Sequence, residues 1–86
     1  MSVDNKVWWS REFIQVLLVG KSESKKTDRY EVRNKNLDEL LGWIRWYAPW
    51  RKYVFYSNHS TCFDSKCLFE IAEACAHRTE IQKNKK

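Results

Sequence analysis

The chain has 86 residues, of which 43% are hydrophobic and 15% aromatic, including five Trp, four Tyr and four Phe. This composition excludes a disordered chain, and only two Gly and one Pro exclude collagen-like or linker-like sequence. No stretch is apolar enough to span a membrane, and the first residues lack the pattern of a secretory signal. We therefore expect a single cytoplasmic domain over residues 1–86, with loose tails at residues 1–6 and 80–86.

The charge balance narrows the class of partner. Sixteen Lys and Arg against eleven Asp and Glu give a net charge of +5. A small basic domain is attracted to polyanions, or to acidic proteins that imitate them. The charge therefore favours binding functions and says little about the fold.

The first half of the chain predicts two strands separated by a polar loop. Residues 13–19 are rich in β-branched side chains and end at Gly20, which favours a strand buried on both faces. The same residues also fit a helical stripe, so a helix over residues 7–20 remains an alternative. Residues 21–28 are typical of a loop, and residues 29–33 alternate as a half-buried strand does.

The densest aromatic stretch, residues 40–56, predicts a β-hairpin that turns at Pro49. Period-two alternation divides its side chains between two faces. One face carries Gly42, Ile44, Trp46, Arg51, Tyr53 and Phe55, and the other carries Trp43, Arg45, Tyr47, Trp50, Lys52, Val54 and Tyr56. A one-residue bulge near Pro49 would exchange the two sets.

The last third of the chain predicts one amphipathic helix that begins at Asp64 or Ser65, either of which can cap the first turn. The expected apolar stripe consists of Leu68, Ile71, Ala72 and Cys75. We expect the helix to fray between residues 79 and 84. The predicted fold is α+β: an antiparallel sheet of three to five strands with this helix packed on it. One helix covers only part of such a sheet, so some aromatic surface stays exposed or is covered by a partner.

The hairpin and the start of the helix together resemble a pattern in small phage and prophage proteins. The pattern is LG-x-I-x-WY-x-PWR-x-Y-x-F followed by CL-x-x-I, and it is carried here by Leu41, Gly42, Ile44, Trp46, Tyr47, Pro49, Trp50, Arg51, Tyr53, Phe55, Cys67, Leu68 and Ile71. Proteins with this pattern commonly have a Pro after the last strand, where this sequence has Ser57 and Asn58. The resemblance implies a phage or mobile-element origin and action inside a bacterial cell, and it names no catalytic residue.

Five residues could supply metal-binding or catalytic side chains: His59, Cys62, Cys67, Cys75 and His77. Their types suit zinc, but their spacing does not match paired zinc knuckles, and buried cysteines often serve as small hydrophobic residues. A catalytic Cys–His pair would combine His59 with Cys62 or Cys67, since Cys67 falls in the first turn of the predicted helix, where the helix dipole favours a thiolate. Nothing marks a substrate pocket, however. We therefore expect no enzyme activity, no metal and no cofactor.

The predicted binding surface lies on the hairpin. It comprises Trp43, Arg45, Tyr47, Trp50, Arg51, Lys52 and Tyr56. The first hypothesis is a host or phage protein as partner, in a host-takeover or anti-defence role, or a second copy of the chain as a homodimer. The second is single-stranded DNA or RNA, whose bases stack on rings and whose phosphates pair with cations. Alternatively, these rings are simply core, with the cations around its rim.

Overall fold

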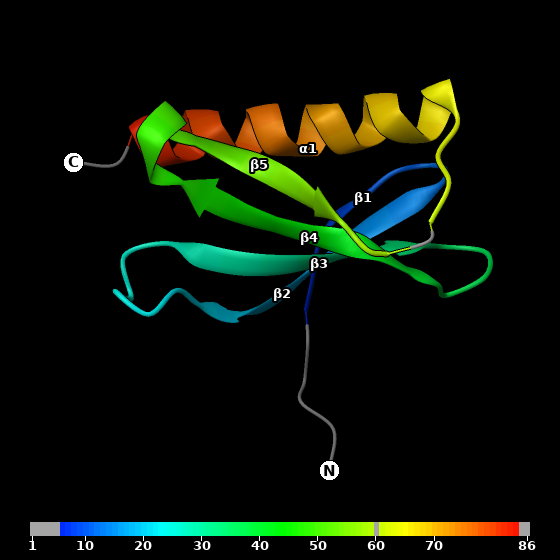
Figure 1. Cartoon of the computed structure of the whole chain (residues 1–86), viewed down its shortest axis with the longest axis horizontal. Helices are drawn as coiled ribbons and strands as arrows, with labels where there is room; N and C mark the ends of the chain where they lie inside the picture. The colour runs from blue at the N-terminus through cyan, green and yellow to red at the C-terminus, as the bar shows by residue number, and fades with distance from the viewer. Residues whose placement is uncertain (1–5, 60, 85–86) are drawn as a thin grey trace, which may run out of the picture.

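The computed structural model describes residues 6–59 and 61–84, which form a five-stranded antiparallel sheet and one helix (Figure 1). The elements are β1 (Lys6–Ser10), β2 (Ile14–Lys21), β3 (Asp28–Asn34), β4 (Leu40–Tyr47), a 3-10 turn (Ala48–Trp50), β5 (Lys52–Ser57) and α1 (Ser65–Lys83). The strands pair in chain order, as a meander. The predicted α+β class is therefore confirmed. Loose tails were expected at residues 1–6 and 80–86, of which residues 1–5 and 85–86 lie outside the described residues. Where the structure describes them, the expectation is wrong, because Lys6 begins β1 and residues 80–83 belong to α1.

The strand prediction for residues 13–19 is confirmed by β2, but the prediction of burial on both faces is wrong. Ile14 and Val16 are fully buried, whereas Gln15 and Leu17 are only half-buried. The reason is that α1 covers one side of the sheet, so β2 has one core face. The additional edge strand β1 was not predicted, because it is short and its register against β2 shifts between Val7 and Trp9.

The hairpin of β4 and β5 has the predicted register. Ile44 pairs with Phe55 on one face, and Trp43 pairs with Tyr56 on the other. The pairing runs without a shift from Gly42 to Tyr47, so the two faces are not exchanged by a bulge. The turn after Pro49 is closed by Arg51, whose backbone is left-handed with φ 55°.

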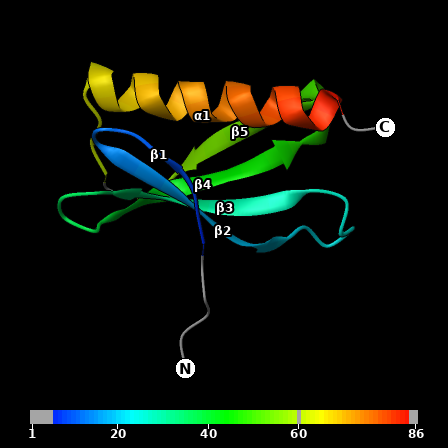
Figure 2. The same cartoon turned by 180° about the vertical axis from the view of Figure 1, so that it is seen from behind.

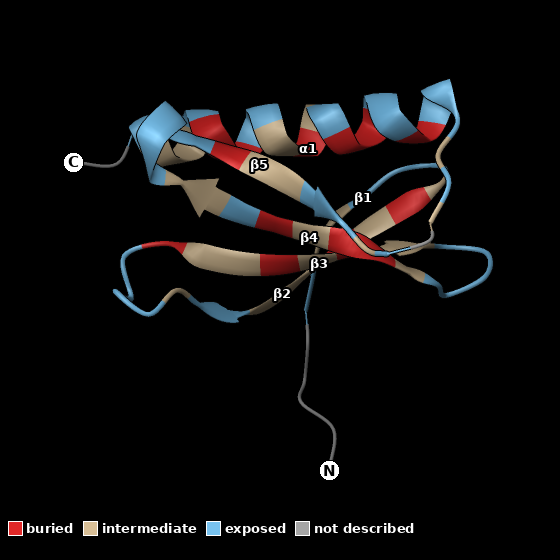
Figure 3. Cartoon of the chain, in the orientation of Figure 1, coloured by how far each residue is buried: buried red, intermediate tan, exposed pale blue. Residues whose placement is uncertain are grey.

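The helix is rotated relative to the predicted stripe. Leu68, expected in the core, is 48% exposed, and Ala72 is also exposed. The face that contacts the sheet carries Cys67, Glu70, Ile71, Ala74, Arg78 and Thr79. Figure 3 shows this buried face turned toward the sheet. The helix also continues to Lys83, beyond the expected start of fraying.

Polar side chains explain this rotation. The Glu70 carboxylate accepts hydrogen bonds from the backbone N–H groups of Phe13, at 3.0 Å, and Ile14, at 3.2 Å. The Thr79 hydroxyl accepts one from the N–H of Tyr53, at 2.9 Å, on the edge strand β5. Buried polar groups need such partners, so these bonds fix which helix face meets the sheet. Asp64 caps the helix as predicted, accepting a 2.9 Å bond from the N–H of Cys67.

In residues 6–59 and 61–84, no helix is long and apolar enough to span a membrane.

Candidate functional site

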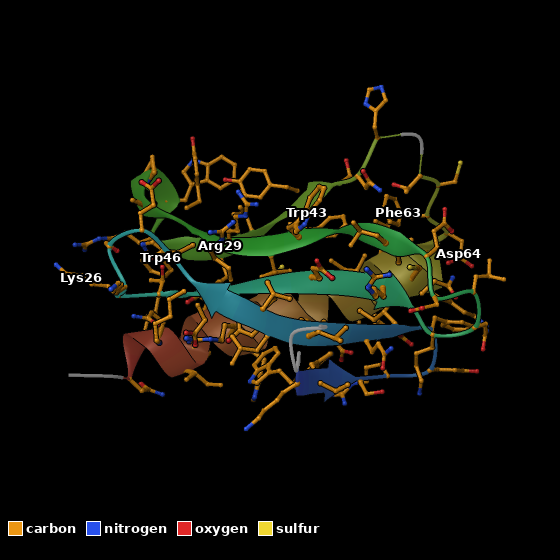
Figure 4. All side chains as sticks on the ribbon, turned by 90° about the horizontal axis from the view of Figure 1, so that it is seen from below. Lys26, Arg29, Trp43, Trp46, Phe63 and Asp64 are labelled. Atoms are coloured by element: carbon orange, nitrogen blue, oxygen red, sulfur yellow. The ribbon has the colours of Figure 1, made fainter. Side chains whose placement is uncertain are left out.

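The side of the sheet opposite α1 carries no second layer in the described part of the chain (Figure 2). On β3, β4 and β5, this side, here called the open face, presents Arg29, Glu31, Arg33, Trp43, Arg45, Tyr47, Lys52, Val54 and Tyr56. Figure 4 looks onto it, with Trp43 near the middle and Arg29 toward one end. The open face therefore brings together five of the seven residues predicted to bind: Trp43, Arg45, Tyr47, Lys52 and Tyr56.

The other two predicted residues lie in the turn. Trp50 is 65% exposed, and its ring packs edge-on against Tyr47 with 4.9 Å between centroids. It extends the aromatic surface beyond the end of the hairpin. Arg51 instead lines a hollow of about 280 Å³ with Trp46 and the C-terminal turn of α1, so it is separated from the open face.

The aromatic residues of this surface differ in exposure. Tyr56 is 42% exposed, whereas Trp43 and Tyr47 are half-buried. Near the turn, a hollow of about 290 Å³ is lined by Tyr47, Trp50, Val54, Phe55 and Tyr56. Rings that keep part of their surface in water are available to stack on a flat ligand or to anchor a partner.

The uncompensated charge of the open face is positive. Arg45 and Lys52 are exposed, and neither forms an ion pair with any residue described in the structure. Among the nine residues named for the open face, Glu31 alone has a carboxylate, and its oxygen lies 3.3 Å from Nε of Arg33. The face therefore attracts anions.

Sequence reasoning missed Arg29 as a site residue. It is half-buried on β3 and lines a hollow with Arg45 of the neighbouring strand, and no described carboxylate pairs with it. The alternation of residues 29–33 in the sequence does place Arg29 on the polar face of a strand. Only the strand order shows that this polar face continues the basic surface of the hairpin.

The structure also tests the metal-binding and thiol chemistry considered for the cysteine and histidine residues. Within residues 6–59 and 61–84, no three His, Cys, Asp or Glu side chains gather as a metal site requires. The expectation of a favoured thiolate at Cys67 is wrong, because burial, with the nearby Asp64 and Glu70 carboxylates, raises the pKa of this thiol. Burial also raises the pKa of Cys75 to about 11. Both thiols are poor nucleophiles at neutral pH.

Comparison with known proteins identifies the family of the chain. Over 62 residues it is 41% identical to the "Uncharacterized 9.3 kDa protein" of Acholeplasma phage L2, covering 72% of this chain and 78% of that protein. The chain belongs to the family of this phage protein. The resemblance to small phage proteins is thus confirmed. No protein-family model matches the chain, and no solved structure matches it.

Proposed function

We propose that this phage protein binds single-stranded nucleic acid through the open face of its sheet and through Trp50, and that it catalyses no reaction. The observation that carries the proposal is the alternation of partly exposed rings with cations that have no described carboxylate partner. Bases stack on aromatic side chains regardless of sequence, while the phosphates between them pair with Arg and Lys. An open sheet supplies both groups on one rigid surface.

This proposal reverses the order of preference drawn from the sequence, which placed a protein partner first. Arg29, Arg45 and Lys52 favour a ligand that carries negative charge near the turn end of the hairpin. A phosphate backbone supplies such charge at every nucleotide, whereas a protein partner must present a matching acidic surface.

A protein partner in the bacterial host cytoplasm is the second candidate. The observation in its favour is the mainly aromatic hollow beside Trp50, because Trp and Tyr are common anchors of protein interfaces. A second copy of the chain is one form of this candidate. Tagged protein recovered from nuclease-treated bacterial lysate with a discrete protein at moderate salt would favour it over nucleic acid.

The proposed function is tested by fluorescence anisotropy with labelled single-stranded DNA and RNA of about 20 nucleotides. We expect binding that weakens steeply as salt rises, since cations on the protein displace counterions from the phosphates. Trp50→Ala should weaken binding by roughly tenfold, the effect of losing one stacked base.

Phe69→Ala is the matched control. Phe69 is 65% exposed, as Trp50 is, but it lies on α1, away from the open face. Its removal should leave affinity unchanged. Absence of binding at low salt, or equal losses in the two variants, would refute the proposal.

A further inference from the structure

A hollow of about 390 Å³ lies at the end of the sheet where the β2–β3 loop meets β4. It is lined by Ser22, Glu23, Ser24, Thr27, Arg29, Arg45 and Trp46. Figure 4 shows Lys26, Arg29 and Trp46 close together at this end of the sheet, away from Phe63 and Asp64 at the other end. The lining therefore consists of two arginines, three hydroxyl-bearing residues, one tryptophan and one glutamate.

The loop that forms one wall is held in a defined shape. The N–H of Ser22 donates to the carbonyl of Thr27 at 2.8 Å, and the N–H of Lys25 donates to the carbonyl of Ser22 at 2.9 Å. The hydroxyl groups of Ser22 and Ser24 lie 3.0 Å apart. Such bonds hold the hydroxyl groups in place before a ligand arrives, which lowers the entropic cost of binding.

Arg29 on β3 and Arg45 on the adjacent strand β4 are direct neighbours. Tyr30 pairs with Ile44, so the residues adjacent to this pair, Arg29 and Arg45, lie beside each other on the open face. Like charges in such positions destabilise a sheet unless an anion lies between them. Neither arginine has an ion-pair partner in residues 6–59 and 61–84.

The acids near the hollow do not cancel this charge. The Asp28 carboxylate already forms two ion pairs, with Lys21 Nζ at 2.8 Å and with Arg78 Nη2 at 3.1 Å. Glu23 lines the hollow and is exposed, but Lys25 and Lys26 of the same loop outnumber it. The hollow is therefore a site of net positive charge that is also lined by hydroxyl-bearing residues.

We propose that this hollow binds a terminal phosphate group of a nucleotide, with Arg29 and Arg45 as its cationic ligands. Two guanidinium groups match the nearly double negative charge of a phosphomonoester better than the single charge of an internal phosphodiester. Because the arginines belong to the open face, a strand bound there would end in the hollow, with Trp46 beside its last nucleotide. This inference rests on the proposed function, although a free mononucleotide carries the same phosphate chemistry.

The test compares matched oligonucleotides that carry a 5′-phosphate, a 3′-phosphate or only hydroxyl ends, each measured by anisotropy. Inorganic phosphate and nucleoside monophosphates are titrated separately by calorimetry. We expect one phosphorylated end to bind about tenfold more tightly than the hydroxyl-ended strand, the size of one charge-assisted pair. Arg29→Gln should abolish this difference.

Arg33→Gln is the matched control, since Arg33 lies on the same strand and face but is paired with Glu31. It should preserve the preference for a phosphorylated end. Arg29→Lys keeps the positive charge but removes the side-by-side N–H donors of the guanidinium group. It therefore tests the phosphate site even if Arg29→Gln folds poorly.

The outcomes separate the two proposals. Equal binding of phosphorylated and hydroxyl-ended strands would overturn the phosphate site and leave the open face as a binding surface. Binding of a nucleoside monophosphate that is lost in Arg29→Gln, with no strand bound, would support the phosphate site and overturn the proposed function. Retention of the end preference in both arginine variants would overturn the assignment of Arg29.

Discussion

Arg78 of α1 and Asp28 at the start of β3 form a mostly buried ion pair, with side-chain exposures of 3% and 18% and with 3.1 Å between Nη2 and Oδ2. The same guanidinium donates through Nε to the hydroxyl of Tyr30 at 2.6 Å and lies 4.7 Å from the ring centre of Tyr53. One helical side chain thus contacts β3 and β5, which are separated in the sheet by β4. This arginine fixes the position of the C-terminal half of the helix over the sheet.

Replacing Arg78 should therefore be costly. Arg78→Met removes one partner of a buried pair and leaves Asp28 without its main ligand from the helix, for a loss of about 3 kcal/mol of unfolding free energy. Glu73→Gln is the control, because it breaks the exposed 3.7 Å pair with Arg11 and should cost less than about 1 kcal/mol. Urea unfolding of both variants measures the difference. Equal small losses would contradict the central role of Arg78.

The same pair predicts a fall in stability at acid pH. Burial by itself would raise the pKa of Asp28, but hydrogen bonds from Lys21 and Arg78 outweigh it and lower the pKa below its ordinary value of 3.8. Since the folded pKa is the lower one, the stabilisation is complete above about pH 4 and is lost as the pH falls through the folded value.

Asp28→Asn should reduce stability at pH 7 and flatten this acid dependence. Asp38→Asn is the control, since Asp38 lies in an exposed turn with its carboxylate 3.7 Å from Arg33. It should leave the acid slope close to that of the parent protein. Unfolding free energies measured from pH 7 down to pH 3 decide between these results, and an unchanged slope in Asp28→Asn would contradict the assignment.

The hairpin register was predictable because alternation is a local property. Ring and cation positions in residues 40–56 follow from period two once Pro49 marks the turn. The helix face was not predictable from hydropathy, because Glu70 and Arg78 look like surface residues in the sequence. They are buried only because strands distant in the chain supply their partners.

The candidate site was predictable only in part, for the same reason. The five open-face residues of the hairpin lie on one local element, so the sequence could group them. Arg29 belongs to a different strand, and only the strand order β3–β4 places it beside Arg45. Arg51 shows the opposite case, since its neighbours at the end of α1 separate it from the open face.

Gly42 should not tolerate a side chain. A Cβ at this position would clash with the carbonyl oxygen of Tyr56 and lie 2.7 Å from ring atoms of Phe55. Gly42→Ala therefore forces the β4–β5 pair to shift, with an expected loss of about 2 kcal/mol. Gly20→Ser is the comparison, because a Cβ there meets no atom within 4 Å, so its only cost is the positive φ of 159°, which L side chains rarely adopt. A loss at Gly42 no larger than at Gly20 in thermal or urea unfolding would contradict the tight packing.

The three thiols should react at different rates. Cys62 is exposed, whereas Cys67 is buried and Cys75 is half-buried, and both of the latter have pKa values raised by burial. In the folded protein at pH 8, we expect Ellman's reagent to modify one thiol rapidly and the other two slowly. In denaturant all three should react together, and Cys62→Ser should remove the rapid phase. Rapid reaction of two or more thiols in the folded protein would contradict the burial of the helix cysteines.

The open face allows binding and stability to be separated. Arg45→Ala with Lys52→Ala removes two exposed cations that have no described ion-pair partner, so the unfolding free energy should change by less than about 1 kcal/mol. Affinity for single-stranded nucleic acid should nevertheless fall, and the slope of log affinity against log salt should decrease by roughly one to two. Lys66→Ala with Lys83→Ala removes the same charge from exposed positions on α1. If the helix variant lost as much affinity as the sheet variant, net charge rather than the open face would account for binding.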